Sequence, residues 1–133
     1  MEKGDRFTRD FELSREIYEG FIALFADRNE LHTDRAFAQA AGFKAEVMHG
    51  NILNGFLSYF VDECLPVRNV IIHSQEIKYS KPVYLGDRLT LSAEISEVFE
   101  SVHALELRFR FVKADGEAVA KGKIQLGVLS PAS

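Results

Sequence analysis

The sequence predicts a single α+β domain in which a curved antiparallel sheet surrounds one buried helix. Two patterns carry this prediction: apolar residues follow helical spacing up to about Cys64, and they alternate with polar residues after Val70. The 133 residues suffice for one hydrophobic core, and no repeat or Pro/Gly/Ser-rich linker divides them. We therefore expect residues 1–133 to form one domain.

The N-terminal segment predicts an extended start followed by a first helix. The extended start lies around residues 7–11. Ser14 has a side-chain oxygen suited to cap a helix, and apolar residues recur after it at helical spacing. These residues are Ile17, Phe21, Leu24 and Phe25. The helix should end near Ala26, because segment 27–32 is mostly polar and is expected to be a loop between helices.

A short helix and a longer, more apolar helix follow. The short helix should begin at Thr33 or Asp34 and end at Gly42, a residue type common just past a helix C-terminus. The apolar helix follows Gly50, and its polar interruptions are Asn51, Asn54 and Ser58. Because its apolar groups surround much of the circumference, other elements must cover it.

The second half of the chain predicts four long strands that cover this helix. Residues 70–79, 89–96, 105–111 and 120–128 carry the strand pattern. The pair Asp115-Gly116 is typical of a hairpin turn between the last two strands. The connections are short, so the strands should pair mostly antiparallel with their apolar side chains on the helix.

Composition limits the classes of function. Acidic residues outnumber basic ones, 20 against 16, and the net charge of -4 argues against a nucleic-acid or anionic-membrane partner. Cys64 is the only cysteine, which excludes an internal disulfide and a four-cysteine zinc site and favours a reducing compartment. No segment reaches the roughly 18 apolar residues of a membrane span, and no apolar signal segment begins the chain. We expect a cytoplasmic protein.

Residues with acid and base chemistry are concentrated in segment 27–32. Asp27, Asn29 and His32 lie within six residues, where a loop can direct all three side chains at one bound water. A carboxylate accepts a proton, and an imidazole accepts or donates one near neutral pH. The alternative is structural: Asp27 would be a polar group at a helix end, and His32 a hydrogen-bonded partner of the next helix. The spacing alone does not separate the two.

The pair His49-Gly50 at the start of the apolar helix is a second candidate. Unpaired backbone N–H groups and the positive end of the helix dipole would stabilise a carbonyl oxygen that gains negative charge. Gly50 either lets a substrate approach the backbone or serves a tight turn into the helix. We expect His49 to hydrogen-bond backbone while its ring packs. No residues show metal-ligand spacing, so we expect no metal site.

The order of these motifs resembles that of the (R)-specific enoyl-CoA hydratases and MaoC-like dehydratases. Their signature, approximately D-x-N-P-L-H followed by a short helix and H-G, is present as segment 27–32 and His49-Gly50. Segment 79–89 is similar to the family's strand and P-V-x-x-G-D turn, and segment 116–122 to its closing strand. The similarity runs in order from residue 17 to residue 128.

The resemblance implies a hot-dog fold and a homodimer or higher homo-oligomer. It also implies reversible hydration of a trans-2-enoyl thioester to an (R)-3-hydroxyacyl thioester. The carrier would be coenzyme A or an acyl carrier protein, with no separate cofactor. Asp27 and His32 would be the acid/base pair, and Asn29 would help to hold the water. The Gly50 N–H would bind the thioester oxygen beside His49, and Ser58 matches a position that can hydrogen-bond the aspartate.

The sequence also departs from the family pattern. Glu30 stands where the family usually has proline, which leaves the backbone freer. Asn51 and Asn54 stand where relatives often carry apolar residues, which favours either a short or polar acyl group or hydrogen bonds within the protein. These departures leave open an acyl-thioester-binding module without turnover. A thioesterase on the same fold is a second alternative.

Overall fold

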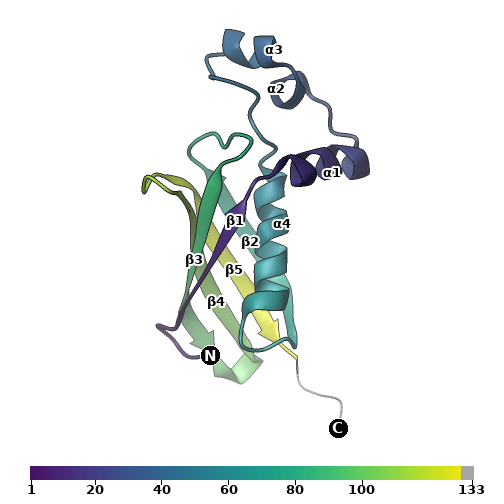
Figure 1. Cartoon of the computed structure of the whole chain (residues 1–133). Coiled ribbons are helices and arrows are strands. Elements are labelled where there is room, and N and C mark those ends of the chain that lie inside the picture. The colour runs from purple at the N-terminus through teal and green to yellow at the C-terminus, as the bar shows by residue number, and fades with distance from the viewer. Residues whose placement is uncertain (130–133) are drawn as a thin grey trace.

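Five strands form one antiparallel sheet that curves around helix α4 in the computed structural model, which describes residues 1–129 (Figure 1). The strands are β1 (Arg6–Glu12), β2 (Val70–Tyr79), β3 (Arg88–Phe99), β4 (Ala104–Lys113) and β5 (Ala118–Val128). Their order across the sheet is β1-β3-β4-β5-β2. This arrangement is the predicted α+β hot-dog fold, in which a curved sheet is wrapped around a central helix.

Strand β1 adds a fifth strand to the four long strands that the sequence predicts. Only four long strands were predicted, but the short extended start pairs antiparallel with β3, with Phe7 opposite Ala93 and Phe11 opposite Leu89. The Phe11 ring stacks on Phe56 of the central helix at a centroid distance of 4.6 Å. A strand of seven residues is therefore held by contacts with segments far along the chain.

The helices occupy the predicted places with one correction. They are α1 (Arg15–Phe25), α2 (Glu30–Thr33), α3 (Arg35–Ala40) and α4 (Asn51–Tyr59), with a π-helical turn at Phe60–Cys64 and a 3₁₀ turn at Glu100–Val102. Ser14 caps α1 as predicted, and its hydroxyl accepts a hydrogen bond from the Ile17 N–H at 3.2 Å. The prediction of a loop over 27–32 is wrong in its second half, because Asn29 caps the one-turn helix α2 there.

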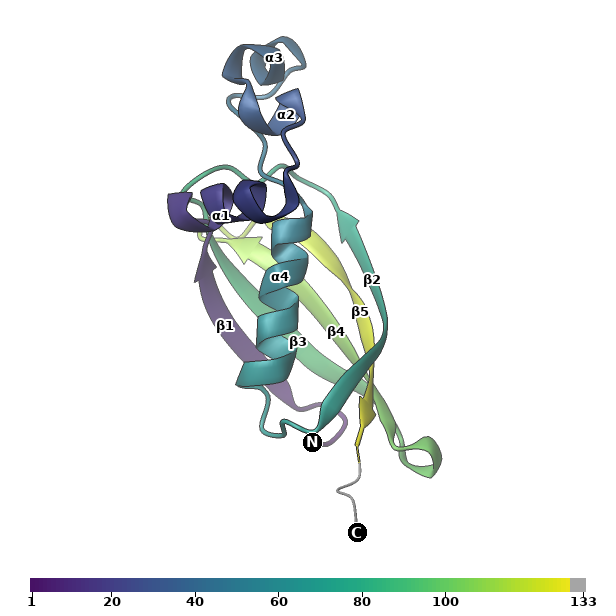
Figure 2. The ribbon, with the colours of Figure 1, turned by 90° about the vertical axis from the view of Figure 1, so that its right-hand side faces the viewer.

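Helices α1 to α3 lie at one end of the sheet. Figures 1 and 2 show α1 across the N-terminal end of α4, while α2 and α3 project beyond the sheet. The chain then returns to Gly50, where α4 begins. This path brings segment 27–32 close to the start of α4, although about 20 residues separate them in sequence.

The core lies between α4 and the inner face of the sheet. Leu57, Phe60 and Val61 from the helical side have no exposed surface, and neither do Leu91 and Leu107 from the strands. Their burial explains why the helix pattern covers most of the circumference and the strand pattern covers one face. Within residues 1–129, no helix is long and apolar enough to cross a membrane.

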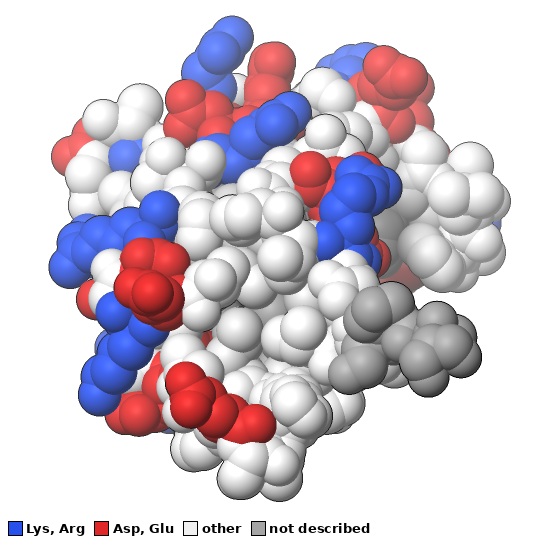
Figure 3. All heavy atoms as spheres, turned by 90° about the horizontal axis from the view of Figure 1, so that it is seen from below, with Lys and Arg blue, Asp and Glu red and all other residues white. Residues whose placement is uncertain are grey.

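Charged side chains on the end of the molecule opposite α1 form no large patch of one sign. Figure 3 shows Lys and Arg side chains mixed with Asp and Glu around the rim of this face, with uncharged residues at its centre. Ion pairs contribute to this mixture, including Lys3 with Glu97 at 3.4 Å and Arg68 with Glu63 at 2.7 Å.

Candidate active site

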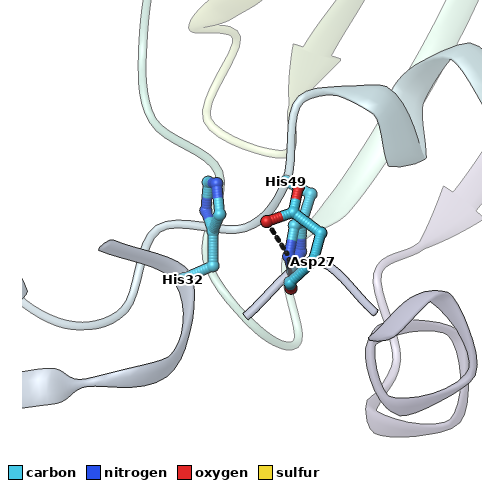
Figure 4. A group of neighbouring side chains, drawn as sticks. All are labelled: Asp27, His32 and His49. Atoms are coloured by element: carbon cyan, nitrogen blue, oxygen red, sulfur yellow. Dashed lines mark hydrogen bonds and ion pairs between the residues drawn. The ribbon is translucent and has the colours of Figure 1, made fainter. Parts of the chain in front are cut away.

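Asp27 follows directly on the C-terminal cap of α1. The cap residue, Ala26, has a left-handed φ of 57°, which ends the helix and turns the chain. The Asp27 side chain is 47% exposed, and its Oδ1 accepts a hydrogen bond from the Asn29 N–H at 3.4 Å. The same oxygen lies 4.0 Å from His49 Nε2 (Figure 4). The carboxylate therefore remains open to solvent while it faces an imidazole.

The His32 ring is oriented by a carbonyl group on the segment that precedes α4. His32 Nδ1 lies 2.7 Å from the Val47 carbonyl oxygen. Because a carbonyl only accepts hydrogen bonds, Nδ1 carries the proton and Nε2 of the neutral ring keeps its lone pair. The Tyr18 hydroxyl also donates a hydrogen bond of 2.6 Å to the His32 backbone carbonyl. His32 is thus held at both its ring and its backbone.

His49 is buried between the two segments of the site. Only 3% of its surface is exposed, and its Nε2–H donates a hydrogen bond of 2.9 Å to the Asp27 backbone carbonyl. Its ring centroid lies 4.0 Å from that of His32 and 4.7 Å from that of Phe21. These contacts correspond to the backbone bonding and ring packing expected for His49, and they tie α1 and α2 to the start of α4.

Gly50 supplies the backbone group at the start of α4. Within residues 1–129, neither the Gly50 N–H nor the Asn51 N–H donates a hydrogen bond. Gly50 has φ -59° and ψ -33°, so a turn requiring glycine is absent. A Cβ at this position would instead stand 3.0 Å from the ring of Tyr79 at the end of β2. The glycine is therefore needed for close approach, and the group that approaches is an aromatic ring of the protein.

A cavity of about 520 Å³ lies beside His32, His49 and Gly50, while Asp27 is not among the residues that line it. Its wall includes His32, His49, Gly50 and Tyr79, together with apolar residues such as Leu53. Another hollow, of about 590 Å³, lies among charged side chains on the outer face of the sheet and contains none of these groups. The smaller cavity is the one that combines apolar walls with an imidazole and free backbone N–H groups.

The three titratable side chains form a compact group. Asp27, His32 and His49 each offer one donor atom, and these atoms lie within 4.8 Å of one another. In the tautomers that these carbonyl acceptors require, His32 Nδ1 and His49 Nε2 both donate their protons to carbonyl groups. Within residues 1–129, His32 Nε2 and His49 Nδ1 then have no protein partner, and the Asp27 carboxylate accepts only from the Asn29 N–H, so the arrangement suits acid/base chemistry at a bound water.

The remaining predicted residues have other surroundings. The Asn29 side-chain oxygen accepts from the Leu31 N–H at 3.0 Å and so caps α2. Ser58 is exposed on α4, about two turns beyond Gly50. Among the described residues it makes no hydrogen bond with Asp27. Asn54 bonds to protein groups, which is the second of the two interpretations given to it.

Sequence reasoning missed two tyrosines of the site. Tyr18 is on α1, between the apolar positions that defined this helix, so its helical spacing gave only a packing signal. Tyr79 lies at the end of β2, two residues after Ile77 and on the same face of the strand. This position indicated an inward side chain, whereas its contact with Gly50 depends on the tertiary structure.

Comparisons with known proteins agree with this fold. The family model described as "MaoC like domain" matches residues 4–112. The chain is 30% identical over 103 residues to the (R)-specific enoyl-CoA hydratase of Aeromonas caviae, covering 77% of each chain. It is 28% identical over 115 residues to the 3-hydroxybutyryl-CoA dehydratase of Methylorubrum extorquens, covering 83% of this chain and 73% of the relative.

A solved structure shows the same architecture. The (R)-hydratase from A. caviae, described as involved in PHA biosynthesis, superimposes with a TM-score of 0.88 at 26% identity. The match covers 97% of this chain and 98% of the hydratase. The family model spans most of the chain, and the relatives match it over most of their own length. The chain therefore belongs to the MaoC-like domain family and has its hot-dog fold.

Proposed function

We propose that this protein catalyses the reversible addition of water across the 2,3 double bond of a trans-2-enoyl thioester, giving an (R)-3-hydroxyacyl thioester. The relatives with hydratase and dehydratase names make a hydro-lyase the class of enzyme to which the chain belongs. One observation carries the finer proposal: the Asp27 carboxylate lies within 4.8 Å of the imidazoles of His32 and His49, and His32 lines one cavity together with Gly50, whose N–H has no partner within residues 1–129.

The acid/base step would use Asp27 and His32 together. Water is a poor nucleophile, so one member of the pair removes a proton from it as the water oxygen bonds to C3. The pair then supplies the proton that C2 receives, so that the elements of one water molecule are added in total. Because two neighbouring groups share their titration, the base is assigned to the pair and not to one residue.

The thioester oxygen would bind at the N-terminus of α4. Attack at C3 pushes electrons through C2 onto this oxygen, which becomes enolate-like. The Gly50 N–H has no partner within residues 1–129, and the helix dipole favours negative charge at this end. Such a bond is stronger in the enolate-like state than in the substrate, and that difference accelerates the reaction.

The substrate would be a thioester of coenzyme A or of the phosphopantetheine of an acyl carrier protein. The acid/base pair and the helix N-terminus supply the chemistry of hydration themselves, so the proposal needs no separate cofactor. We propose a homodimer as the working form. Asn29 would support the water by holding the turn between Asp27 and α2.

Hydration of crotonyl-CoA tests this function, with loss of the enoyl absorbance and the configuration of the product as readouts. We expect Asp27→Asn and His32→Ala each to lower kcat by about 100-fold or more, because each removes a proton-transfer group. Asp62→Asn makes the first of these chemical changes at an exposed position outside the cavity and should keep wild-type turnover.

Other outcomes would contradict parts of the proposal. Wild-type turnover in both Asp27→Asn and His32→Ala would mean that the acid/base pair lies elsewhere. Release of free thiol with the product would indicate a thioesterase. Tight binding of acyl-CoA without turnover, over a panel of short, long and polar enoyl groups, would indicate a binding module.

A further inference from the structure

The Tyr79 ring lies directly against the start of α4. Its Cε1 and Cζ atoms are 3.0 Å from the position that a Gly50 Cβ would occupy, and its hydroxyl oxygen is 3.4 Å from that position. Tyr79 and Gly50 both line the cavity that also contains His32. A phenol group therefore lies against the residue whose free N–H the proposed function assigns to the thioester oxygen.

Asn54 determines which way the Tyr79 hydroxyl can donate. The Asn54 Nδ2 group donates one hydrogen bond to Tyr79 at 3.0 Å and one to Asn51 Oδ1 at 2.9 Å. The orientation of the Asn54 amide is set by Gln75, whose Nε2 donates to Asn54 Oδ1. The Tyr79 oxygen is thus an acceptor toward α4. Its own hydrogen has no acceptor within residues 1–129.

Two donors without protein acceptors within residues 1–129 therefore belong to residues that line one cavity. A carbonyl oxygen has two lone pairs and can accept from both. A hydroxyl that already accepts a hydrogen bond is polarised and becomes a stronger donor. Burial raises the pKa of Tyr79 above 10.0, with the hydrogen bond from Asn54 as an opposing influence, so the hydroxyl is protonated at neutral pH.

We propose that the Tyr79 hydroxyl is a catalytic hydrogen-bond donor that shares the thioester oxygen with the Gly50 N–H. Asn54 is a positioning residue, since its Nδ2 group donates to the Tyr79 oxygen and so directs the hydroxyl hydrogen away from Asn54. The inference rests on the proposed hydratase function and adds a specific residue to it. It also gives Asn54 a role that does not involve the acyl chain.

Tyr79→Phe is the decisive variant, because it removes the hydroxyl and keeps the ring against Gly50. We expect kcat for crotonyl-CoA hydration to fall on the order of 100-fold, as for the loss of one oxyanion donor, with little change in KM. Tyr59→Phe is the matched control. Its hydroxyl lies at the far end of α4, 3.5 Å from Arg9 and outside the cavity, and its loss should leave turnover unchanged.

A spectroscopic measurement isolates the hydrogen bond from the chemistry. In an Asp27→Asn background, in which turnover is expected to be slower by about 100-fold or more, a conjugated dienoyl-CoA should show a red shift of its absorbance on binding, because the thioester carbonyl is polarised. Adding Tyr79→Phe should reduce this shift. Asn54→Ala should reduce the red shift partly, because it leaves the phenol in place but removes the hydrogen bond that orients its hydroxyl.

The outcomes separate this inference from the function on which it rests. A wild-type protein that does not hydrate enoyl thioesters would overturn the proposed function. Wild-type hydration together with an unchanged kcat and an unchanged dienoyl shift in Tyr79→Phe would overturn the role of Tyr79 alone. Circular dichroism of each variant shows whether a loss of activity comes from loss of folding.

Discussion

His32 is held at two atoms, and each attachment controls a different property. The bond from Nδ1–H to the Val47 carbonyl selects the tautomer, which leaves Nε2 as a proton acceptor. The bond from the Tyr18 hydroxyl to the His32 carbonyl fixes the backbone that carries the ring. Neither partner is a charged group or part of a sequence motif. The chemistry of this histidine therefore depends on two neighbours that only the folded chain supplies.

Tyr18→Phe tests the second attachment. Removing the hydroxyl leaves the His32 carbonyl without this donor, which should lower the free energy of unfolding by about 1 kcal/mol. A less firmly placed imidazole should also lower kcat, by up to about 100-fold if the ring moves on the order of 1 Å. Urea unfolding and the crotonyl-CoA assay measure the two effects. A variant with wild-type kcat would show that α2 holds His32 without Tyr18.

The Tyr18 hydroxyl should also make the free energy of unfolding depend on pH. Burial, and next the charge of Glu46, raises the pKa of Tyr18 above its ordinary value of 10.0. Folding then favours the protonated form, so this stabilisation is complete below pH 10 and is lost as the pH rises through the folded-state pKa. The difference in unfolding free energy between the wild type and Tyr18→Phe should therefore narrow above pH 10. A constant difference would contradict this assignment.

At the scale of elements, strand β2 links the sheet to the site. It pairs with β5 along nine register positions from Val70 to Tyr79, with one irregularity between Ile72 and Ser74. Its last residue is the tyrosine that packs on Gly50. The close approach of β2 to β5 is made possible by Gly122, where a Cβ would stand only 1.8 Å from the Glu76 carbonyl oxygen. The position of Tyr79 thus depends on a glycine in another strand.

Gly122→Ala should therefore damage both stability and activity. The clash is with backbone, so β2 must move away from β5, at a cost of about 3 kcal/mol or more. Gly20→Ala in α1 is the matched control: nothing lies within 4 Å of its Cβ position, and alanine is the better helix former. We expect this control to raise the unfolding free energy by up to about 1 kcal/mol. Equal effects of the two substitutions in urea unfolding would contradict the packing argument.

At the scale of the whole molecule, the sheet has two edges of different character. The β1 edge is seven residues long and carries several charged side chains, which is typical of an edge protected against pairing. The β2 edge is ten residues long and exposes 48% of Ile71. A long strand that pairs on only one side is open to pairing with a second copy of the chain.

We expect the protein to form the homodimer implied by its family resemblance, through this β2 edge. Size-exclusion chromatography with light scattering should give the mass of two chains or a multiple of it. Ile71→Asp, which places a charge on the exposed apolar part of β2, should shift the protein toward the monomer. Ile17→Asp in α1 is a control at another exposed apolar residue and should leave the mass unchanged. A monomeric wild type would contradict this prediction.

The sequence by itself determined the parts of the fold that come from local periodicity. Alternation along β3, β4 and β5 and the apolar circumference of α4 are properties of neighbouring residues. The alternating segments bury their apolar side chains only as strands, and the apolar segment does so only as a covered helix. The cap at Ser14 and the turn at Asp115-Gly116 are local in the same sense, and both are present. The residues with acid/base chemistry could also be named, because they lie together in one short segment.

Only the tertiary structure decided how those residues are used. Strand β1 and the one-turn helix α2 are too short for a periodic signal. Pairing with β3 holds β1, and the caps at Asn29 and Asp34 hold α2. The tautomer of His32 depends on a carbonyl 15 residues away. The reason for glycine at position 50 lies in an aromatic ring from β2. Each is a distance between segments that the chain brings together only on folding, and spacing along a sequence does not specify such a distance.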